Sequence, residues 1–362
     1  MSAAGRFEIR SAAGTSSAII LEAGLRTRLG TCLASLGARA CVLLLDRGLP
    51  SEHRASVRAG LPGGVPVIEV PGGEAAKSIE SVQSVWEDLL RLGVDRETTV
   101  VTCGGGAVSD LGGFIAGTWM RGVPVVHIPT TLLAQVDAAI GGKSAVNLGP
   151  VKNPIGVFHH PRAVLLDPGF LATVPEREFR AGLAEVIKYA LIRDPEILTM
   201  LPGLTRTDLP RLADLVLRSA RIKGEIVAAD PTDQGQRNIL NAGHTVGHAL
   251  ESVSHAQLPV LLHGEAVAIG LAAETSISLR LGLMSAEEHR VVIGALVAAG
   301  LPVAVPAPWS AAAVLRFLRH DKKIAAGVVR WPLVVGIGSC QPGGEVPDGI
   351  VREALGHVGC HG

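Results

Sequence analysis

The chain has 362 residues, enough for two domains of roughly 100–200 residues each. Hydrophobic residues make up 48% of it, charged residues only 18%, and glycines number 44, which excludes a disordered chain and is typical of a globular protein with many tight turns. The formal net charge is zero and no block of lysine and arginine occurs, so neither nucleic acid nor an anionic membrane surface is an expected partner.

The five cysteines are widely spaced and form no CxxC pair, which argues against a zinc ribbon or a redox motif. No apolar run approaches the roughly 20 residues that span a bilayer, and the first residues lack the apolar segment of a signal peptide. We therefore expect a protein of the reducing cytoplasm.

Short apolar runs alternate with helical patterns in the first half of the chain. We expect a helix over residues 78–92 and strands over residues 40–45, 65–70, 98–102, 124–128 and 163–166. Strand–helix alternation of this kind predicts a mostly parallel α/β sheet.

The pattern changes after about Asp167, where helical periodicity becomes dominant. The expected helices span residues 176–192, 208–227, 238–253, 264–281 and 287–299. Proline and glycine punctuate residues 166–173, LDPGFLAT, which we interpret as a hinge. An α/β domain followed by a mainly helical domain is therefore predicted.

A triple glycine, Gly104-Gly105-Gly106, follows the predicted strand 98–102 and precedes a helical pattern. Glycines at such a turn let a phosphate approach backbone N–H groups at the positive end of a helix. A tight turn that needs the backbone freedom of glycine is an equally good interpretation. Asp46 ends an earlier strand and could hold a ribose hydroxyl, although turn formation explains a lone aspartate better.

Three histidines and a glutamate suggest a metal site. His244 and His248 lie four residues apart in a helical pattern, so they share one face, and His263 follows. Imidazole suits zinc and similar ions. Glu185 lies on an otherwise apolar helix, where an unpaired charge is costly to bury. A single histidine is usually a satisfied surface or core residue, but this cluster favours three ligands with an open catalytic position.

Several cationic residues lie in segments that are otherwise apolar or glycine-rich. They are Lys143, Lys152, Lys188, Lys223 and Arg237, with Lys322 and Lys323 as a further pair. If they converged on one cleft, they would hold a phosphate and a carboxylate. Spacing alone does not show convergence, because a solvated surface is the usual position of a lysine. From the residues alone we predict an α/β enzyme that uses a nucleotide and a metal.

The strings themselves resemble the 3-dehydroquinate synthase family, in the family's order from about residue 70 to 325. They are PGGEAAKS (71–78), GGGAVSDLGGFIAGTWMRGV (104–123), PTTLLAQVDAAIGGKSAVN (129–147), KNPIGVFHHP (152–161), RAGLAEVIKYALI (180–192), LNAGHTVGHALE (240–251), LHGEAVAIG (262–270) and HDKK (320–323). The resemblance implies a fold of the α/β plus α class, usually a homodimer. Its parts are a Rossmann-like NAD-binding domain, residues 1–168, and a mainly helical metal- and substrate-binding domain, residues 169–362.

The same resemblance assigns the site residues. The implied metal ligands, usually for zinc or cobalt, are Glu185, His244 and His263. The positions that match NAD contacts are Asp46, Glu74, Lys77, Gly105, Gly106, Asp110, Thr130, Thr131, Phe170 and Thr173. The positions that match the substrate pocket are Asp137, Lys143, Lys152, Asn153, Lys188, Lys223, Arg237, Asn241 and His248. Arg121 resembles the arginine that reaches the neighbouring subunit's substrate phosphate, and one of Lys322 and Lys323 is expected to join it.

The resemblance also implies the reaction, which converts 3-deoxy-D-arabino-heptulosonate 7-phosphate to 3-dehydroquinate and phosphate in the shikimate pathway. NAD is used catalytically. It accepts a hydride from a substrate hydroxyl that the metal polarises, phosphate leaves by elimination, and the hydride returns. Ring opening and an intramolecular aldol step then close the carbocycle.

Sister cyclases are the alternatives within the superfamily. Lys188 and His248 argue against the types that make aminodehydroquinate and valiolone, and the string GGKSAVN argues against the 2-deoxy-scyllo-inosose type. Metal-dependent alcohol or glycerol dehydrogenases would not need Lys143, Lys152 and Arg237 to bind phosphate. A non-catalytic nucleotide-binding homologue would tolerate the loss of a metal ligand, yet all three ligands are present.

Overall fold

The structure, a computed structural model, describes residues 4–10, 14, 16–149, 151–256, 258–320 and 329–361. The chain forms two compact units. The first consists of Met1–Pro175 and Thr205–Thr232, and the second of Glu176–Leu204 and Asp233–Gly362.

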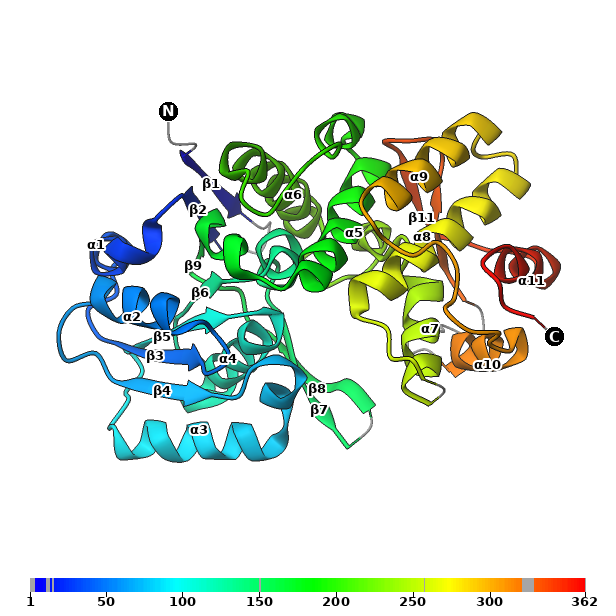
Figure 1. The fold of residues 1–362 in the computed structure, drawn as a ribbon. Coiled ribbons are helices and arrows are strands. Elements are labelled where there is room, and N and C mark those ends of the chain that lie inside the picture. Colours follow the sequence, from blue (N-terminus) through cyan, green and yellow to red (C-terminus); the bar gives the residue numbers. More distant parts are fainter. Residues whose placement is uncertain are drawn as a thin grey trace. The chain divides into compact units, whose positions relative to one another are not determined.

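A seven-stranded sheet lies at the centre of the first unit, in the order β1-β2-β9-β6-β5-β3-β4 (Figure 1). Its strands are β1 (Ala4–Arg10), β2 (Ser16–Glu22), β3 (Cys41–Asp46), β4 (Val67–Val70), β5 (Thr99–Gly104), β6 (Val125–Pro129) and β9 (Ala163–Leu166). β1 is antiparallel to β2, and the other pairs are parallel. The expected strands are confirmed close to their expected bounds, whereas the sequence analysis missed the β1–β2 hairpin.

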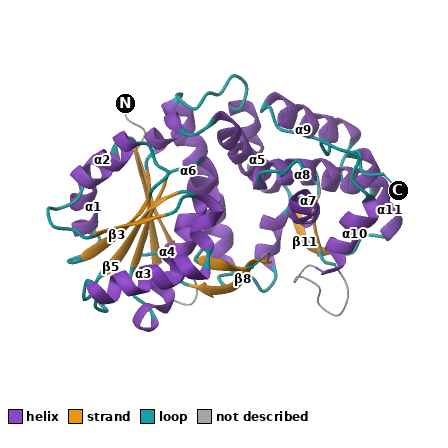
Figure 2. Ribbon diagram, turned by 60° about the horizontal axis from the view of Figure 1, so that its bottom comes forward, coloured by secondary structure: helices purple, strands orange, loops and turns teal. Residues whose placement is uncertain are grey.

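Helices cover both faces of this sheet (Figure 2) because successive side chains of a strand point to opposite faces. The helices of the unit are α1 (Leu29–Ser35), α2 (Ser51–Gly60), α3 (Ile79–Arg91), α4 (Gly106–Thr118) and α6 (Leu209–Ala229). Val42 and Leu44 of β3 pack into a core with α3 and α4, while Leu43 and Leu45 pack into a second core with α1 and α2. Burial on both faces explains the continuous apolar run of this strand.

Short elements connect these parts of the first unit. Two strands, β7 (Lys143–Leu148) and β8 (Val151–Phe158), form an antiparallel hairpin that was not predicted. Residues 166–173, interpreted as a hinge, instead finish β9 and form a 3-10 helix within the first unit. The short helices are η1 (Leu25–Arg28), η2 (Gly73–Lys77), η3 (Trp119–Arg121), the π-helix η4 (Ala134–Ala138) and η5 (Pro168–Thr173).

The two units are not separated by one boundary at residues 168/169, as the predicted domains would be. The first unit runs on to Pro175, and residues 205–232 return to it. This segment carries α6, which packs against β1, β2, η4 and η5. The boundary shifts because α6 buries its apolar face on the sheet unit, although it lies among the helices of the second half in sequence.

The second unit is mainly helical, as expected. The helices α5 (Glu176–Ile192), α8 (His263–Arg280) and α9 (Ala286–Ala298) lie where the periodicity placed them. The remaining elements are η6 (Pro195–Met200), η7 (Gln236–Asn241), α7 (His244–Ala256), α10 (Ala311–His320), β10 (Trp331–Val334), β11 (Cys340–Gly344) and α11 (Asp348–His357). Among the described residues, no helix has the length and apolar character needed to cross a membrane.

The expected helix over residues 238–253 is wrong at its start. Gly243 has a left-handed backbone with φ +77°, which separates the 3-10 helix η7 from α7. His244 is therefore the first residue of a helix instead of lying in its middle.

A buried histidine in the sheet predicts how stability depends on pH. His127 of β6 is 3% exposed, and its Nδ1 lies 2.8 Å from the hydroxyl of Thr102. Burial, and to a smaller extent the charge of His159, lowers the pKa of His127 to about 3. Below the ordinary pKa near 6.5, His127 binds a proton in the unfolded chain but stays neutral in the folded protein. The free energy of unfolding therefore decreases as pH falls.

When the pH is lowered from about 7 to about 5, the free energy of unfolding should decrease in both proteins. We expect the decrease to be about 2 kcal/mol smaller in His127→Gln than in the wild type. Urea unfolding of both proteins at the two pH values measures the difference. Equal losses in the two proteins would show that His127 is not the neutral buried group described here.

Candidate functional site

The carboxyl ends of the parallel strands carry every position expected to contact NAD. Asp46 ends β3. The others are Glu74 and Lys77 in η2 after β4, Gly105, Gly106 and Asp110 after β5, Thr130 and Thr131 after β6, and Phe170 and Thr173 in η5 after β9. Ligands of open α/β sheets bind at this edge. The sheet topology thus brings together residues that are far apart in sequence.

The loops meet closely at Asp46, where glycine leaves room. A Cβ atom at Gly104 would lie 2.9 Å from Cβ of Asp46, and one at Gly72 would lie 2.6 Å from its Oδ1. The N–H of Gly48 donates to the same oxygen at 2.7 Å, so Asp46 also closes the turn after β3, as the simpler interpretation predicted. Glycine is needed at both positions because Asp46 occupies the space that a side chain would fill.

One ion pair and one hydrogen bond connect η2, which follows β4, to neighbouring elements of the first unit. Nζ of Lys77, whose side chain is 4% exposed, donates to Oδ2 of Asp110 at 2.5 Å. Burial raises the pKa of Asp110, although Lys77 opposes this shift. Glu74 accepts a hydrogen bond from Asn147 at 2.9 Å, a contact that the sequence analysis missed. These contacts hold η2 beside α4 and the β7–β8 hairpin.

Two of the predicted substrate positions form a pair within the first unit. Nζ of Lys223 on α6 donates to the carbonyl oxygen of Asp137 at 2.6 Å and lies 2.9 Å from its Oδ1. Asp137 belongs to the π-helix η4, an irregular turn of a kind that is frequent at functional sites. The return of α6 to the sheet unit is what creates this pair.

The remaining first-unit positions are exposed. Lys143 lies at the start of β7, and Lys152 and Asn153 lie on β8. Asn153 has φ +55°, and its N–H donates to Oδ1 of Asn147 at 3.0 Å. Arg121 ends η3 with φ +68°. For these lysines the structure shows the surface position that is usual for a lysine.

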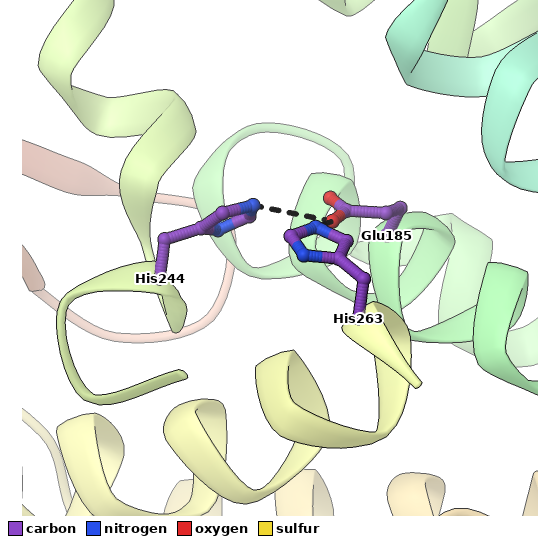
Figure 3. A group of neighbouring side chains, drawn as sticks. All are labelled: Glu185, His244 and His263. Carbon is purple, nitrogen blue, oxygen red and sulfur yellow. Dashed lines mark ion pairs between the residues drawn. The ribbon is translucent and has the colours of Figure 1, made fainter. Parts of the chain in front are cut away.

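The predicted metal ligands come together in the second unit (Figure 3). Glu185 lies on α5, and His244 and His263 are the first residues of α7 and α8. One ligand atom from each lies within 4.8 Å of the others. Nε2 of each histidine is 3.3 Å from Oε1 of Glu185.

The charge of Glu185 is unusually buried. Its side chain has no exposed surface, and neither oxygen makes a hydrogen bond of good geometry with a described residue. Its close contacts are ion pairs, including Nζ of Lys188 at 2.5 Å. Burial raises the pKa of Glu185, but Lys188 and the histidines outweigh burial and hold it well below its usual range. A buried carboxylate without hydrogen bonds needs cations, so a divalent metal ion fits this position.

Acceptors behind the two histidines orient their rings. Nδ1 of His244 lies 3.1 Å from the carbonyl oxygen of Ala242, and Nδ1 of His263 lies 3.4 Å from Oε2 of Glu251. A proton on each Nδ1 leaves each Nε2 as the ligand atom that faces Glu185, the arrangement found in many metal centres. Without a metal ion, burial disfavours protonation of His263, but its contacts with Glu185 and Glu251 raise its pKa to about 10, so an ion that binds Nε2 has to displace a proton. The sequence analysis missed Glu251, although it ends the string LNAGHTVGHALE.

Other predicted residues lie in the same unit. The ring centroid of His248 is 5.2 Å from that of His244 and 5.9 Å from that of His263, so the shared helix face is confirmed. Arg237, which is buried, and Asn241 belong to η7. Lys322 and Lys323 lie outside the described residues.

Two family models match consecutive parts of the chain. The model for the 3-dehydroquinate synthase N-terminal domain matches residues 67–181, and that for the 3-dehydroquinate synthase C-terminal domain matches residues 182–324. The chain belongs to the 3-dehydroquinate synthase family. The 3-dehydroquinate synthase of Gloeobacter violaceus is 42% identical over 344 residues, which are 93% of this chain and 95% of that protein.

Solved structures of sugar-phosphate cyclases resemble this member of the 3-dehydroquinate synthase family over almost its whole length. The 2-epi-5-epi-valiolone synthase of Streptomyces hygroscopicus, with NAD+ and Zn2+ bound, is 30% identical at a TM-score of 0.84 and covers 95% of this chain and 97% of its own. A 2-deoxy-scyllo-inosose synthase complexed with carbaglucose-6-phosphate, NAD+ and Co2+ also has a TM-score of 0.84 and covers 97% and 99%. At 24% identity the latter shows the fold alone. The predicted fold class is confirmed.

Proposed function

We propose that this protein is a 3-dehydroquinate synthase, a carbon–oxygen lyase of the shikimate pathway that serves aromatic amino acid biosynthesis. It converts 3-deoxy-D-arabino-heptulosonate 7-phosphate to 3-dehydroquinate and phosphate. The observation that carries the proposal is the group of Glu185, His244 and His263, of which the first two are buried, in a chain of this family.

The donor set supports zinc or cobalt as the metal, because one carboxylate and two imidazoles leave coordination positions for substrate oxygens. When bound, the ion would supply Lewis acidity toward a substrate hydroxyl, and NAD would supply an acceptor that takes up and returns one hydride. We assign the ion to Glu185, His244 and His263. We assign NAD to the positions at the carboxyl edge of the sheet, from Asp46 to Thr173.

The substrate carries a phosphate and a carboxylate, and the residues that we assign to substrate binding include cations for both. Lys188 and Lys223 are buried ammonium groups that carboxylates hold in place, so they present fixed positive charge. Fixed charges stabilise the negative charge that develops when a proton leaves the carbon beside a ketone. The other assigned residues are Asp137, Lys143, Lys152, Asn153, Arg237, Asn241, His248 and one of Lys322 and Lys323.

A homodimer is part of the proposal, with Arg121 reaching the substrate phosphate of the neighbouring subunit. Met120, Arg121 and Gly122 have φ values of +47°, +68° and +116°. Left-handed backbone at a non-glycine residue costs about 1–3 kcal/mol and is frequent at functional sites. Exposed apolar side chains could supply contact surface, namely Met120, Leu148, Val151 and Phe158. A single-chain mass by light scattering at micromolar concentration would contradict the dimer.

We place the protein in the cytoplasm. All five cysteines are free thiols, as a reducing compartment would keep them. The partner is a small sugar phosphate, and no large basic surface is needed to bind it.

Release of inorganic phosphate tests the proposal. We expect phosphate to be released from 3-deoxy-D-arabino-heptulosonate 7-phosphate with trace NAD and Co2+, while the amount of NAD stays constant. Stoichiometric NADH would indicate a dehydrogenase instead. Turnover of another heptose or hexose phosphate, without turnover of this substrate, would assign the protein to a sister cyclase.

A further inference from the structure

Glu274 is a buried carboxylate outside the proposed ligand set. It lies on α8, is 3% exposed, and has mainly apolar and small neighbours in the sequence of that helix. Its Oε2 accepts the N–H of Gly243 at 2.7 Å, and its Oε1 accepts the N–H of Val246 at 3.0 Å. Both donors belong to the start of α7, whose first residue is His244.

These two hydrogen bonds cap the N-terminus of α7 with a side chain of the neighbouring helix α8. Gly243 occupies the N-cap position, since its carbonyl oxygen accepts the N–H of Gly247 at 3.1 Å, but glycine has no side chain to bind the free N–H groups. In a capping box, one side chain binds the N–H of the third helical residue and another binds the N–H of the cap residue. Glu274 makes both bonds, and its charge lies at the positive end of α7.

The packing of α7 on α8 explains why the cap comes from another helix. A Cβ atom at Gly243 would lie 2.6 Å from Cγ of Leu271, and one at Gly270 would lie 1.9 Å from the carbonyl oxygen of Gly243. Gly243 also has φ +77°. A serine or aspartate could not take this position without moving the helices apart, so the capping group has to come from α8.

We propose that Glu274 is a positioning residue for the metal centre. It fixes the first turn of α7, and with it His244, against α8, whose first residue is His263. One carboxylate therefore sets the spacing of two of the three ligands without touching either. This inference rests on the proposed function, because it assumes that His244 and His263 bind an ion.

Metal affinity distinguishes this role from a purely structural one. The variants are Glu274→Ala, which removes both acceptors, and Glu274→Gln, which retains one. The matched control is Ser285→Ala on α9, a helix that carries no proposed ligand. Ser285 accepts the N–H of Glu288 at 3.2 Å, so the control also removes a helix cap. Each metal-free protein is titrated with Co2+ against a competing chelator, and its unfolding in urea is measured separately.

We expect Glu274→Ala to weaken Co2+ binding by about 10- to 100-fold and to change the cobalt absorption spectrum, with Glu274→Gln between it and the wild type. Ser285→Ala should lose stability but keep wild-type affinity and spectrum. Folded Glu274 variants with wild-type affinity and spectrum would overturn the inference. If Glu274→Ala does not fold, the Co2+ affinity and spectrum of Glu274→Gln are compared with those of the wild type instead. A wild type that binds Co2+ but releases no phosphate would overturn the proposed function alone.

Discussion

Replacing Glu185 with glutamine is expected to weaken Co2+ binding by at least about 100-fold and to lower turnover by about 1,000-fold or more. Glutamine keeps the shape of the side chain but removes the anionic ligand that Nε2 of both histidines faces at 3.3 Å. It also removes the carboxylate 2.5 Å from Nζ of Lys188, so this buried ammonium group loses its anionic partner as well. Phosphate release and Co2+ titration of the metal-free protein measure the two effects.

The same helix offers a control for this substitution. Glu178 lies exposed in the first turn of α5, so Glu178→Gln should keep wild-type affinity and turnover. A Glu185→Gln protein that bound Co2+ as tightly as the Glu178→Gln protein would show that Glu185 is no ligand. The cyclase mechanism would then lose its metal site.

The second large effect is expected from one added methyl group at Gly270. Its Cβ would lie 1.9 Å from the carbonyl oxygen of Gly243 and 2.9 Å from the N atom of Gly247, both backbone atoms that cannot rotate away. Overpacking of a core costs about 1–3 kcal/mol, and a clash with backbone lies at or above the top of that range. We expect Gly270→Ala to lose about 3 kcal/mol or more of unfolding free energy and to bind Co2+ more weakly, because His244 and His263 move apart.

Gly294→Ala is the matched control for Gly270→Ala. It is the same substitution inside another helix of the second unit, α9, and a Cβ atom there has no neighbour within 4 Å. Alanine is the better helix former by about 0.5–1 kcal/mol, so this variant should gain stability. Urea unfolding of the metal-free proteins gives both values. A stabilised Gly270→Ala protein would contradict the close approach of α7 and α8.

Local sequence pattern was enough to predict most strands of the central sheet and the family of the protein. The five strands β3, β4, β5, β6 and β9 were predicted because each is a short apolar run between turn residues, and burial on both faces makes the inner runs continuous. Strings such as LNAGHTVGHALE and LHGEAVAIG identified the family. Glu274 fits the same burial argument as Glu185, because each is a carboxylate on a largely apolar helix.

Partners across long sequence distances were not predictable in this way. Periodicity identified α6 as a helix but could not show that it packs on β1 and β2, which brings Lys223 to Asp137. The helical periodicity continues across Gly243 without a break. The left-handed backbone of this glycine depends on its contacts with Leu271 and Gly270 of α8, which the local sequence does not show. Glu251 behind His263 was missed for the same reason.

The sequence by itself therefore determined the class of fold, the family, and the three side chains that meet in the second unit. The tertiary structure decided how the chain divides between its units, where α7 begins, and which acceptors orient the histidines and cap their helix. The physical reason is that propensity and burial pattern act along a few residues of chain, whereas ion pairs, caps and backbone clashes depend on which distant segments come into contact.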